Sequence, residues 1–362
     1  MVDLLKVLGF ALLAPAVASC APEFSDRSSA VTGLRVLAIR GTPAEVVPGK
    51  EVAYQLLVVD PQGEVPAPRA DWSYCTQPKP TSELNDVATA CFDNPSVVTK
   101  FGQGAAPTGQ IPVNACAQFG PDVPQPAKGM GTDASGNQVT QTQGRPTDAD
   151  STGGYYQPVI LRVSSDGASL PTLAETRVRC GLAGSTGEQF EQFNARTKLN
   201  ENPELSAVSV TNLGNAELTG SDAASPLAVS PAQGLRLRAA WPACPVTPAC
   251  GDGICSPGET IQACPDDCTT PKGCGGSEPF AYLDPEQHVL VDRHESMRVS
   301  WFASRGSFES DHTGRPESEF SELSTDNTWT APAEPGPVFL WVVLRDDRGG
   351  VDWRSFKVDV RQ

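Results

Sequence analysis

Eleven cysteines constrain this chain more than any other feature, because they limit which loops can be closed and in which compartment the chain can fold. The first, Cys20, follows a short apolar run from Leu4 to Val17. The run is too short to span a bilayer comfortably and small residues precede the cysteine, so the pattern predicts that residues 1–19 are an export signal. An exported chain meets an oxidising compartment, where the other cysteines are expected to form disulfide bonds.

The residues around Cys20 also predict a membrane anchor. The sequence Val17-Ala18-Ser19-Cys20 resembles a bacterial lipobox, in which the cysteine is diacylated and becomes the new N-terminus. The resemblance implies a lipid on Cys20, a tether over residues 20–32 and a place in the cell envelope, periplasmic or surface-exposed. Ala21 follows the cysteine where inner-membrane lipoproteins of enteric bacteria carry aspartate, which favours the outer membrane. Several acyl chains on one cysteine give a stable anchor, whereas a single chain binds only marginally.

Composition narrows both the partners and the fold. The net charge is −16 and no basic cluster exists, so nucleic acid and anionic headgroups are poor partners. Proline and glycine each occur 33 times, which favours short strands joined by turns. Alternating runs of about eight residues between Pro/Gly turns predict a mostly β chain of two immunoglobulin-like β-sandwich domains.

We expect the first domain over residues 33–185 and the second over residues 200–362. Residues 101–154 are rich in Gly, Pro, Gln, Thr and Asp and break the strand pattern, so they predict a long surface loop in the first domain. Residues 244–274 predict a cysteine-rich insertion in the second.

A short internal repeat supports two related sandwiches. The heptapeptide at 69–75 aligns with the one at 238–244, and tryptophan holds the same place in both, as Trp72 and Trp241. We therefore predict that these two tryptophans occupy equivalent positions.

The C-terminal segment carries the clearest strands. Val338 to Leu344 contains no charge, which predicts a central strand covered on both faces. The sequence Asp346-Asp347-Arg348-Gly349-Gly350 then predicts a hairpin turn in which both aspartates are solvated. Four tryptophans cluster here, and sandwich packing is expected for them rather than a carbohydrate-stacking platform: Trp301, Trp329, Trp341 and Trp353. The turn Trp329-Thr330-Ala331-Pro332 and the strands after it resemble bacterial immunoglobulin-like and PKD-type domains.

Residues 250–268 form the most specific local motif. With only Ile254 and Ile261 as large apolar side chains, this segment cannot build a core and needs cross-links. Two disulfides are expected. A zinc site of four cysteines is the alternative, disfavoured because the spacing lacks C-x2-C pairs. We expect Cys244 to pair with Cys274, Cys75 with Cys91, and Cys116 with Cys180. The candidate disulfide cysteines are Cys75, Cys91, Cys116, Cys180, Cys244, Cys250, Cys255, Cys264, Cys268 and Cys274.

The same segment offers hard oxygen ligands of the kind that calcium prefers: Asp252, Glu259, Asp266 and Asp267. Calcium is the cofactor that these acids would bind, and solvated turn acids are the alternative. The segment resembles the CGDGxC-type repeats of exported myxobacterial proteins, which are themselves similar to Notch-type repeats. As a whole the chain resembles an uncharacterised family of myxobacterial lipoproteins, which implies location and architecture but no activity.

No catalytic residues are predicted. The three histidines are His288, His294 and His312, and no hydrolase, metalloprotease or nucleotide-binding motif frames them. His288 and His294 are expected on one face of one strand, as surface histidines.

The sequence favours a non-catalytic envelope lipoprotein that binds a protein or polysaccharide through residues 101–154 and 250–268. A calcium-stabilised adhesion protein and a hydrolase using His294 or His312 are the alternatives.

Overall fold

The computed structural model describes residues 27–79, 87–120, 127–132, 138–143, 151–165, 168–182, 185–222, 225–245, 250–251, 259, 262–268 and 273–362. The predicted export signal, Cys20 and most of the tether lie outside these residues. Within the described residues, no helix has the length and apolar character needed to cross a membrane.

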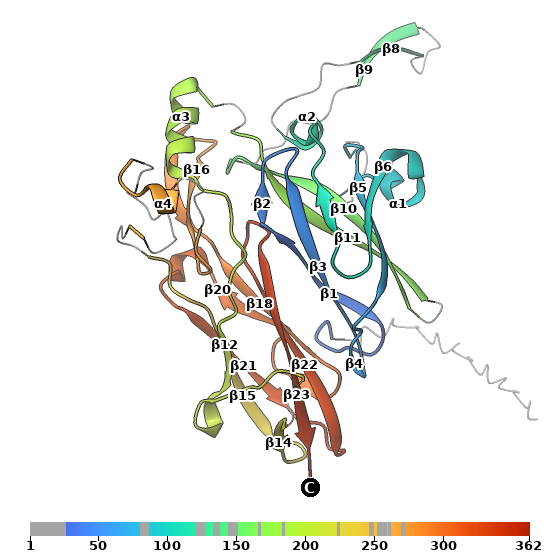
Figure 1. The fold of residues 1–362 in the computed structure, drawn as a ribbon, viewed down its shortest axis with the longest axis vertical. Helices are drawn as coiled ribbons and strands as arrows, with labels where there is room; N and C mark the ends of the chain where they lie inside the picture. The colour runs from blue at the N-terminus through green and yellow to red at the C-terminus, as the bar shows by residue number, and fades with distance from the viewer. Residues whose placement is uncertain are drawn as a thin grey trace, which may run out of the picture.

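Two sheets are built from the first half of the chain (Figure 1). One contains β1 (Arg35–Thr42), β3 (Glu51–Asp60), β4 (Gly63–Glu64) and β7 (Thr108–Gln110). The other runs in the order β2 (Glu45–Val46), β11 (Ala168–Arg179), β10 (Gly154–Ser165), β5 (Arg69–Cys75) and β6 (Val98–Gln103). Their facing residues form one core around Tyr54, Trp72 and Leu161. We call this pair of sheets the first sandwich.

Two further sheets come from the second half and form the second sandwich. One runs in the order β13 (Ala216–Glu217), β12 (Ala207–Val210), β15 (Gly234–Ala240), β21 (Ser324–Thr330) and β19 (Ser307–Phe308). The other runs in the order β14 (Leu227–Val229), β23 (Val351–Val360), β22 (Gly336–Arg345), β18 (Met297–Ala303) and β20 (His312–Arg315).

Both sandwiches have the immunoglobulin-like strand arrangement, which confirms the predicted mostly β fold class. In each, a short early strand pairs in parallel with the last strand: β2 with β11, and β14 with β23. In each sandwich, a fully buried tryptophan lies on the strand that pairs with the second-to-last strand. Trp72 lies on β5, which pairs with β10, and Trp301 lies on β18, which pairs with β22.

The predicted equivalence of Trp72 and Trp241 is therefore wrong. Trp241 follows β15, which pairs with β12 and β21 in the opposite sheet, and Trp301 is the counterpart of Trp72. The heptapeptides resemble each other because each starts with an exposed residue, a buried residue and a less buried residue before a buried tryptophan, a pattern that different strands of a sandwich share.

The predicted loop at 101–154 is wrong over its first part. Here β6 pairs with β5 and β7 pairs with β3, and the Phe101 ring stacks on Tyr74 with centroids 4.1 Å apart. Glycine permits this contact, because a Cβ on Gly109 would lie 2.5 Å from the Phe101 ring. The isolated Phe101 gives too weak a sequence pattern to predict a strand. Within the described part of 101–154, the β8–β9 hairpin (Ala127–Thr132 and Gln138–Gln143) projects beyond the sheets, as Figure 1 shows.

A smaller unit lies beside the two sandwiches. It combines α3 (Gly187–Arg196) with the antiparallel pair β16 (Pro279–Leu283) and β17 (Leu290–His294), which we call the β16–β17 hairpin. Phe193 of α3 is fully buried against Ala281 and Leu283. The remaining short helices are α1 (Ala90–Asp93), η1 (Pro95–Val97), α2 (Ala115–Phe119), η2 (Thr211–Leu213), α4 (Pro265–Cys268) and η3 (Glu317–Glu319).

Strand β22 is central and buried on both faces, as its charge-free sequence predicts. One face enters the core of the second sandwich with Val338, Leu340, Val342 and Leu344. The other packs Trp341 and Val343 against the outer face of the first sandwich, at Leu37, Ala38, Leu57 and Val59. The two sandwiches therefore share an apolar interface.

The tryptophan cluster is core, as expected. Trp301, Trp329 and Trp341 are at most 1% exposed, and Trp353 is partly buried at the sandwich interface. The first three therefore cannot form an exposed stacking platform for carbohydrate.

Candidate functional site

The predicted disulfide pairs form in the structure. Cys75 is bonded to Cys91, Cys116 to Cys180 and Cys244 to Cys274, with Cα–Cα distances of 5.4–5.5 Å. Within the 250–268 motif, Cys250 is bonded to Cys264, and Cys268 is disulfide-bonded as well. Cys255 and the lipidation candidate Cys20 lie outside the described residues.

The calcium candidates do not converge in the described residues. Asp252 lies outside them, Asp266 is exposed, and the Asp267 carboxylate accepts the Gly251 N–H at 2.5 Å. Among these residues the only group with metal-ligand spacing is Cys250, Glu259 and Cys264, within 4.8 Å of one another. Two of its three members are sulfurs already bonded to each other, so this group is not a metal site.

The three histidines do not come together in one site. His294 ends β17, where its ring stacks on Phe320 at 3.8 Å between centroids, and His312 is exposed, with its Nδ1 3.1 Å from Ser300 Oγ. The expected common face of His288 and His294 is wrong, because His288 lies in the turn before β17 with φ of +53°. Nothing in the described surroundings of these rings forms a Ser-His-Asp arrangement.

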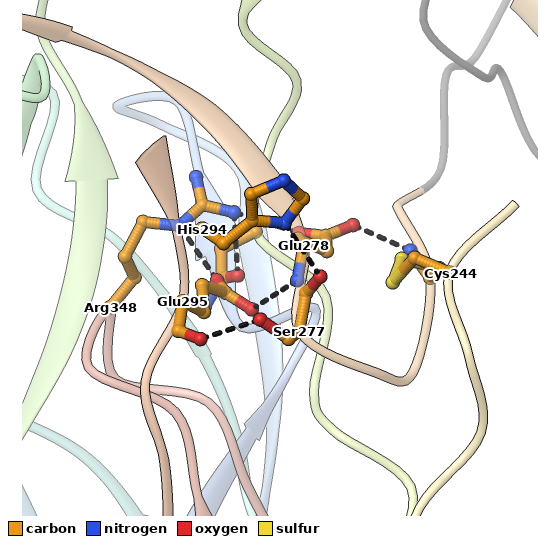
Figure 2. The surroundings of a disulfide bond; sticks show 8 residues. Cys244, Ser277, Glu278, His294, Glu295 and Arg348 are labelled. Carbon is orange, nitrogen blue, oxygen red and sulfur yellow. Dashed lines mark hydrogen bonds and ion pairs between the residues drawn. A yellow bond between two sulfur atoms is a disulfide. The ribbon is translucent and has the colours of Figure 1, made fainter. Parts of the chain in front are cut away.

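The most unusual feature of the described structure is a buried group of charges around Arg348, in the β22–β23 turn. Its guanidinium donates from Nε to Glu295 Oε1 and from Nη2 to Glu278 Oε2, both at 2.7 Å, as Figure 2 shows. Nη2 also donates to Asn200 Oδ1 at 2.9 Å, and the guanidinium lies over the Phe280 ring. Together with Asp346, these residues form what we call the Arg348 cluster: Asn200, Glu278, Glu295, Asp346 and Arg348.

The two glutamates flank the β16–β17 hairpin. Glu278 immediately precedes β16 and Glu295 immediately follows β17. The Glu278 N–H donates to Glu295 Oε2 at 3.1 Å (Figure 2), and the Cys274 N–H donates to Glu278 Oε1. Arg348 therefore fastens both ends of the hairpin, and the disulfide-bonded Cys274, to the turn of the second sandwich.

Asn200 links the Arg348 cluster to the first sandwich. Its side-chain amide donates to Asp346 Oδ2 at 3.2 Å, and its backbone N–H donates to Glu45 Oε2 at 2.8 Å. Glu45 on β2 is completely buried and is bound by Arg179 Nε at 2.8 Å and Arg177 Nε at 3.5 Å. The ion network thus connects both sandwiches and the hairpin.

Asp346 is buried, so the prediction of two solvated turn aspartates is wrong for it and holds for exposed Asp347. Asp346 Oδ1 accepts the N–H groups of Arg348 and Gly350, at 2.9 and 2.7 Å. Gly349 has φ of +97°, and a Cβ on Gly350 would lie 2.1 Å from Asp346 Oδ2. The paired glycines therefore allow the turn to fold around the Asp346 carboxylate.

Burial raises the pKa values of these carboxyl groups, and the positive charge of nearby arginines lowers them. Burial alone would raise the pKa of Glu45, but the guanidiniums of Arg177 and Arg179 outweigh it and lower that pKa to about 2. Burial raises the pKa of Glu278 to about 7 and that of Glu295 well above its usual range, against the opposing charge of Arg348. Burial also raises the pKa of Asp346.

The carboxylates of the Arg348 cluster have their hydrogen-bond partners within the protein. Each carboxylate oxygen of Glu278, Glu295 and Asp346 accepts a hydrogen bond from the protein itself. A cavity of about 220 Å³ beside the cluster is lined by Arg348, Arg177, Tyr156 and Asp347, among others. None of the three buried carboxylates lines this cavity, and Asp346 lines a second one of about 360 Å³ together with Leu37 and Arg345.

Sequence reasoning missed this network. Its members are spread from Glu45 to Arg348, and each alone resembles an ordinary solvated charge. The one available signal was the Asp-Asp-Arg-Gly-Gly turn, whose paired glycines allow a tightly packed conformation.

Comparison with known proteins gives no family. No protein-family model matches the chain, and no curated protein does. Among solved structures, the chain is similar to native alpha-2-macroglobulin of E. coli, with 10% identity and a TM-score of 0.20 over 91% of this chain and 17% of that one. It is also similar to dimeric latent PorU from Porphyromonas gingivalis, with 11% identity and a TM-score of 0.17 over 91% of this chain and 34% of that one. The chain thus spans at most about a third of these proteins, and such low TM-scores carry no functional argument.

Proposed function

We propose that this chain is an exported, lipid-anchored cell-envelope protein that acts as a non-catalytic binding or structural module for a protein or polysaccharide partner. The observation that carries this proposal is the burial of β22 on both faces. Because both sandwiches pack against this strand, the points on the sandwiches from which other segments project have fixed relative positions. Rigid scaffolds of this kind commonly place recognition on their loops.

Export and anchoring rest on different observations. Disulfide bonds across both halves of the chain fit an oxidising compartment, and the apolar leader ending at Cys20 fits a lipidated N-terminus in the outer membrane. With the charge at −16, the lipid rather than the folded surface would make the membrane contact.

The proposed recognition surface is narrower than the sequence suggested. Residues 98–119 form part of the first sandwich, so they are excluded from the proposed recognition surface. The β8–β9 hairpin and the insertion closed by Cys244–Cys274 remain as the two candidate segments.

Cross-linking in intact envelopes tests the binding role. One variant replaces residues 121–150 with a short Gly-Ser linker, a second replaces residues 246–272 in the same way, and exposed Leu213→Ser is the matched control. We expect a partner cross-linked to wild type and control and lost from at least one loop variant. Equal cross-linking of all four proteins, or none in any of them, contradicts the binding role.

Fractionation of Cys20→Ser tests the anchor separately. We expect wild type in the membrane fraction with a lipidated N-terminal mass, and the variant released from it. An unprocessed N-terminus on the wild-type protein would exclude the anchor while leaving the binding test valid.

A further inference from the structure

The Arg348 cluster places three carboxylates around Arg348, two bound to its guanidinium and one to its backbone N–H. Glu278 and Glu295 reach it from the two ends of the β16–β17 hairpin, and Asp346 comes from the same turn as Arg348. All four of these charged residues are at most 8% exposed. When all three acids are ionised, the site holds two more negative than positive charges, which is costly in a buried place.

The surrounding groups do not supply the missing positive charge. From the first sandwich, Arg177 and Arg179 face the cluster together with Glu45, to which both are bound. From the segment joining the sandwiches, Glu201 adds another nearby carboxylate.

The groups on the hairpin itself also have partners elsewhere. Arg293 is paired with Glu317, and the His294 ring stacks on Phe320 with Nδ1 3.5 Å from the Ser277 carbonyl oxygen. From the turn, Asp347 accepts from Ser296. Counted together, five carboxylates (Glu45, Glu201, Glu278, Glu295 and Asp346) surround three guanidiniums (Arg177, Arg179 and Arg348), so the group keeps an excess of two negative charges.

We propose that Glu278, Glu295, Asp346 and Arg348 form a proton-dependent clasp, which fastens the β16–β17 hairpin to the second sandwich when one of the three carboxylates is protonated and loosens it when all are ionised. Protonation of one carboxylate removes one buried negative charge. Loss of that proton leaves three ionised carboxylates around Arg348 in a buried site, where repulsion between like charges is strong.

The direction of the pH dependence follows from proton linkage. Burial raises the pKa of Glu278 from 4.5 to about 7 in the closed clasp, and in an open, hydrated clasp it would return toward 4.5. The closed form therefore binds more protons between these pH values. Closure is favoured at acidic pH and weakens as the pH rises through about 7.

The clasp also sets the base of the cysteine-rich insertion. Glu278 accepts the N–H of Cys274, whose sulfur is bonded to Cys244 at the other end of the insertion. Opening the clasp would therefore release one end of a possible recognition segment. This inference depends only on the described contacts, so it stands or fails independently of the proposed partner binding.

Hydrogen exchange of the full, oxidised chain tests the clasp. Protection of the β16–β17 amides is compared at pH 5.5 and pH 8.5 after correction for intrinsic exchange rates. We expect protection to fall by about tenfold or more at pH 8.5 while amides of the β22–β23 ladder keep theirs. Equal protection of the hairpin at both pH values, or a parallel loss in β22–β23, would overturn the proposal.

Two variants distinguish a pH-responsive role of Glu278 and Glu295 from a purely structural one. Glu278→Gln and Glu295→Gln each place a neutral side chain of the same shape in the cluster, and exposed Glu309→Gln is the matched control. We expect either cluster variant to reduce the pH response of the hairpin at least threefold, and the control to keep it. If the cluster variants respond to pH like wild type, or lose hairpin protection equally at both pH values, the clasp is refuted.

Discussion

Arg345 of β22 reaches across to the first sandwich, where its Nη2 donates to the carbonyl oxygen of Leu37 at 2.7 Å. A second polar link runs beside it, because Asn202 donates to the Gly41 carbonyl at 2.7 Å and accepts the Val351 N–H at 2.9 Å. These bonds border the apolar interface that contains Trp341. The sandwiches are thus joined by packing with directional bonds at its edge, which fixes their relative orientation.

Trp341 should contribute strongly to stability, because its side chain is buried between the sandwiches. We expect Trp341→Ala to lower the free energy of unfolding by about 3–5 kcal/mol, as for other large core truncations. Urea unfolding followed by circular dichroism measures the loss. Leu213→Ala, at a residue 38% exposed, is the control and should stay within about 0.5 kcal/mol of wild type. A loss below about 1 kcal/mol for Trp341→Ala would show that the interface contributes little.

The disulfides should differ in how much they contribute to the free energy of unfolding, because they close loops of different lengths. Cys116–Cys180 spans 64 residues and Cys75–Cys91 spans 16. Loop-closure entropy predicts a loss of about 4 kcal/mol when the first is replaced by two alanines and about 3 kcal/mol for the second. Urea midpoints of the two double variants test this order. The reverse order would mean that local packing, rather than chain entropy, determines how much each disulfide stabilises the protein.

Glu45 should make the protein sensitive to strong acid. Its folded pKa of about 2 lies below the ordinary 4.5, so its contribution is complete above pH 4.5 and is lost as the pH falls toward 2. A shift of this size corresponds to about 3 kcal/mol. Urea unfolding between pH 2 and 6 should show a steeper loss for wild type and for the exposed control Glu51→Gln than for Glu45→Gln. Identical slopes in all three proteins would exclude a paired, ionised Glu45.

Gly350 should tolerate no side chain, because a Cβ there would lie 2.1 Å from Asp346 Oδ2 and close to the Glu201 carbonyl oxygen. We expect Gly350→Ala to cost about 2 kcal/mol or more through displacement of a buried carboxylate. Thermal and urea unfolding provide the measurement. Gly33→Ala is the control, since a Cβ there meets nothing within 4 Å. Equal stability of both variants would show that the turn can rearrange freely.

The sequence predicts those parts of the fold that depend on local pattern. The uncharged run at 338–344 and the glycine pair after it are enough to predict a buried central strand and its hairpin. Cysteine positions likewise suggested the three pairs that form outside the 250–268 motif.

Features that depend on distant contacts could not be predicted in the same way. The match of Trp301 with Trp72 follows from strand order in two sheets, which a short alignment cannot reveal. The Arg348 cluster joins residues up to 148 positions apart, as with Asn200 and Arg348. Acidic side chains usually face water, so burial of Glu278 and Glu295 becomes visible only when the chain is folded.

The double covering of β22 has a consequence for how this protein can be divided. A fragment ending near residue 200 would expose Leu37 and Leu57 to water, and a fragment beginning there would expose Trp341. Immunoglobulin-like modules strung on flexible linkers can be excised or shuffled one at a time. Here each sandwich has its own core but also an apolar outer face covered by the other, so either half made alone should be less soluble than the pair.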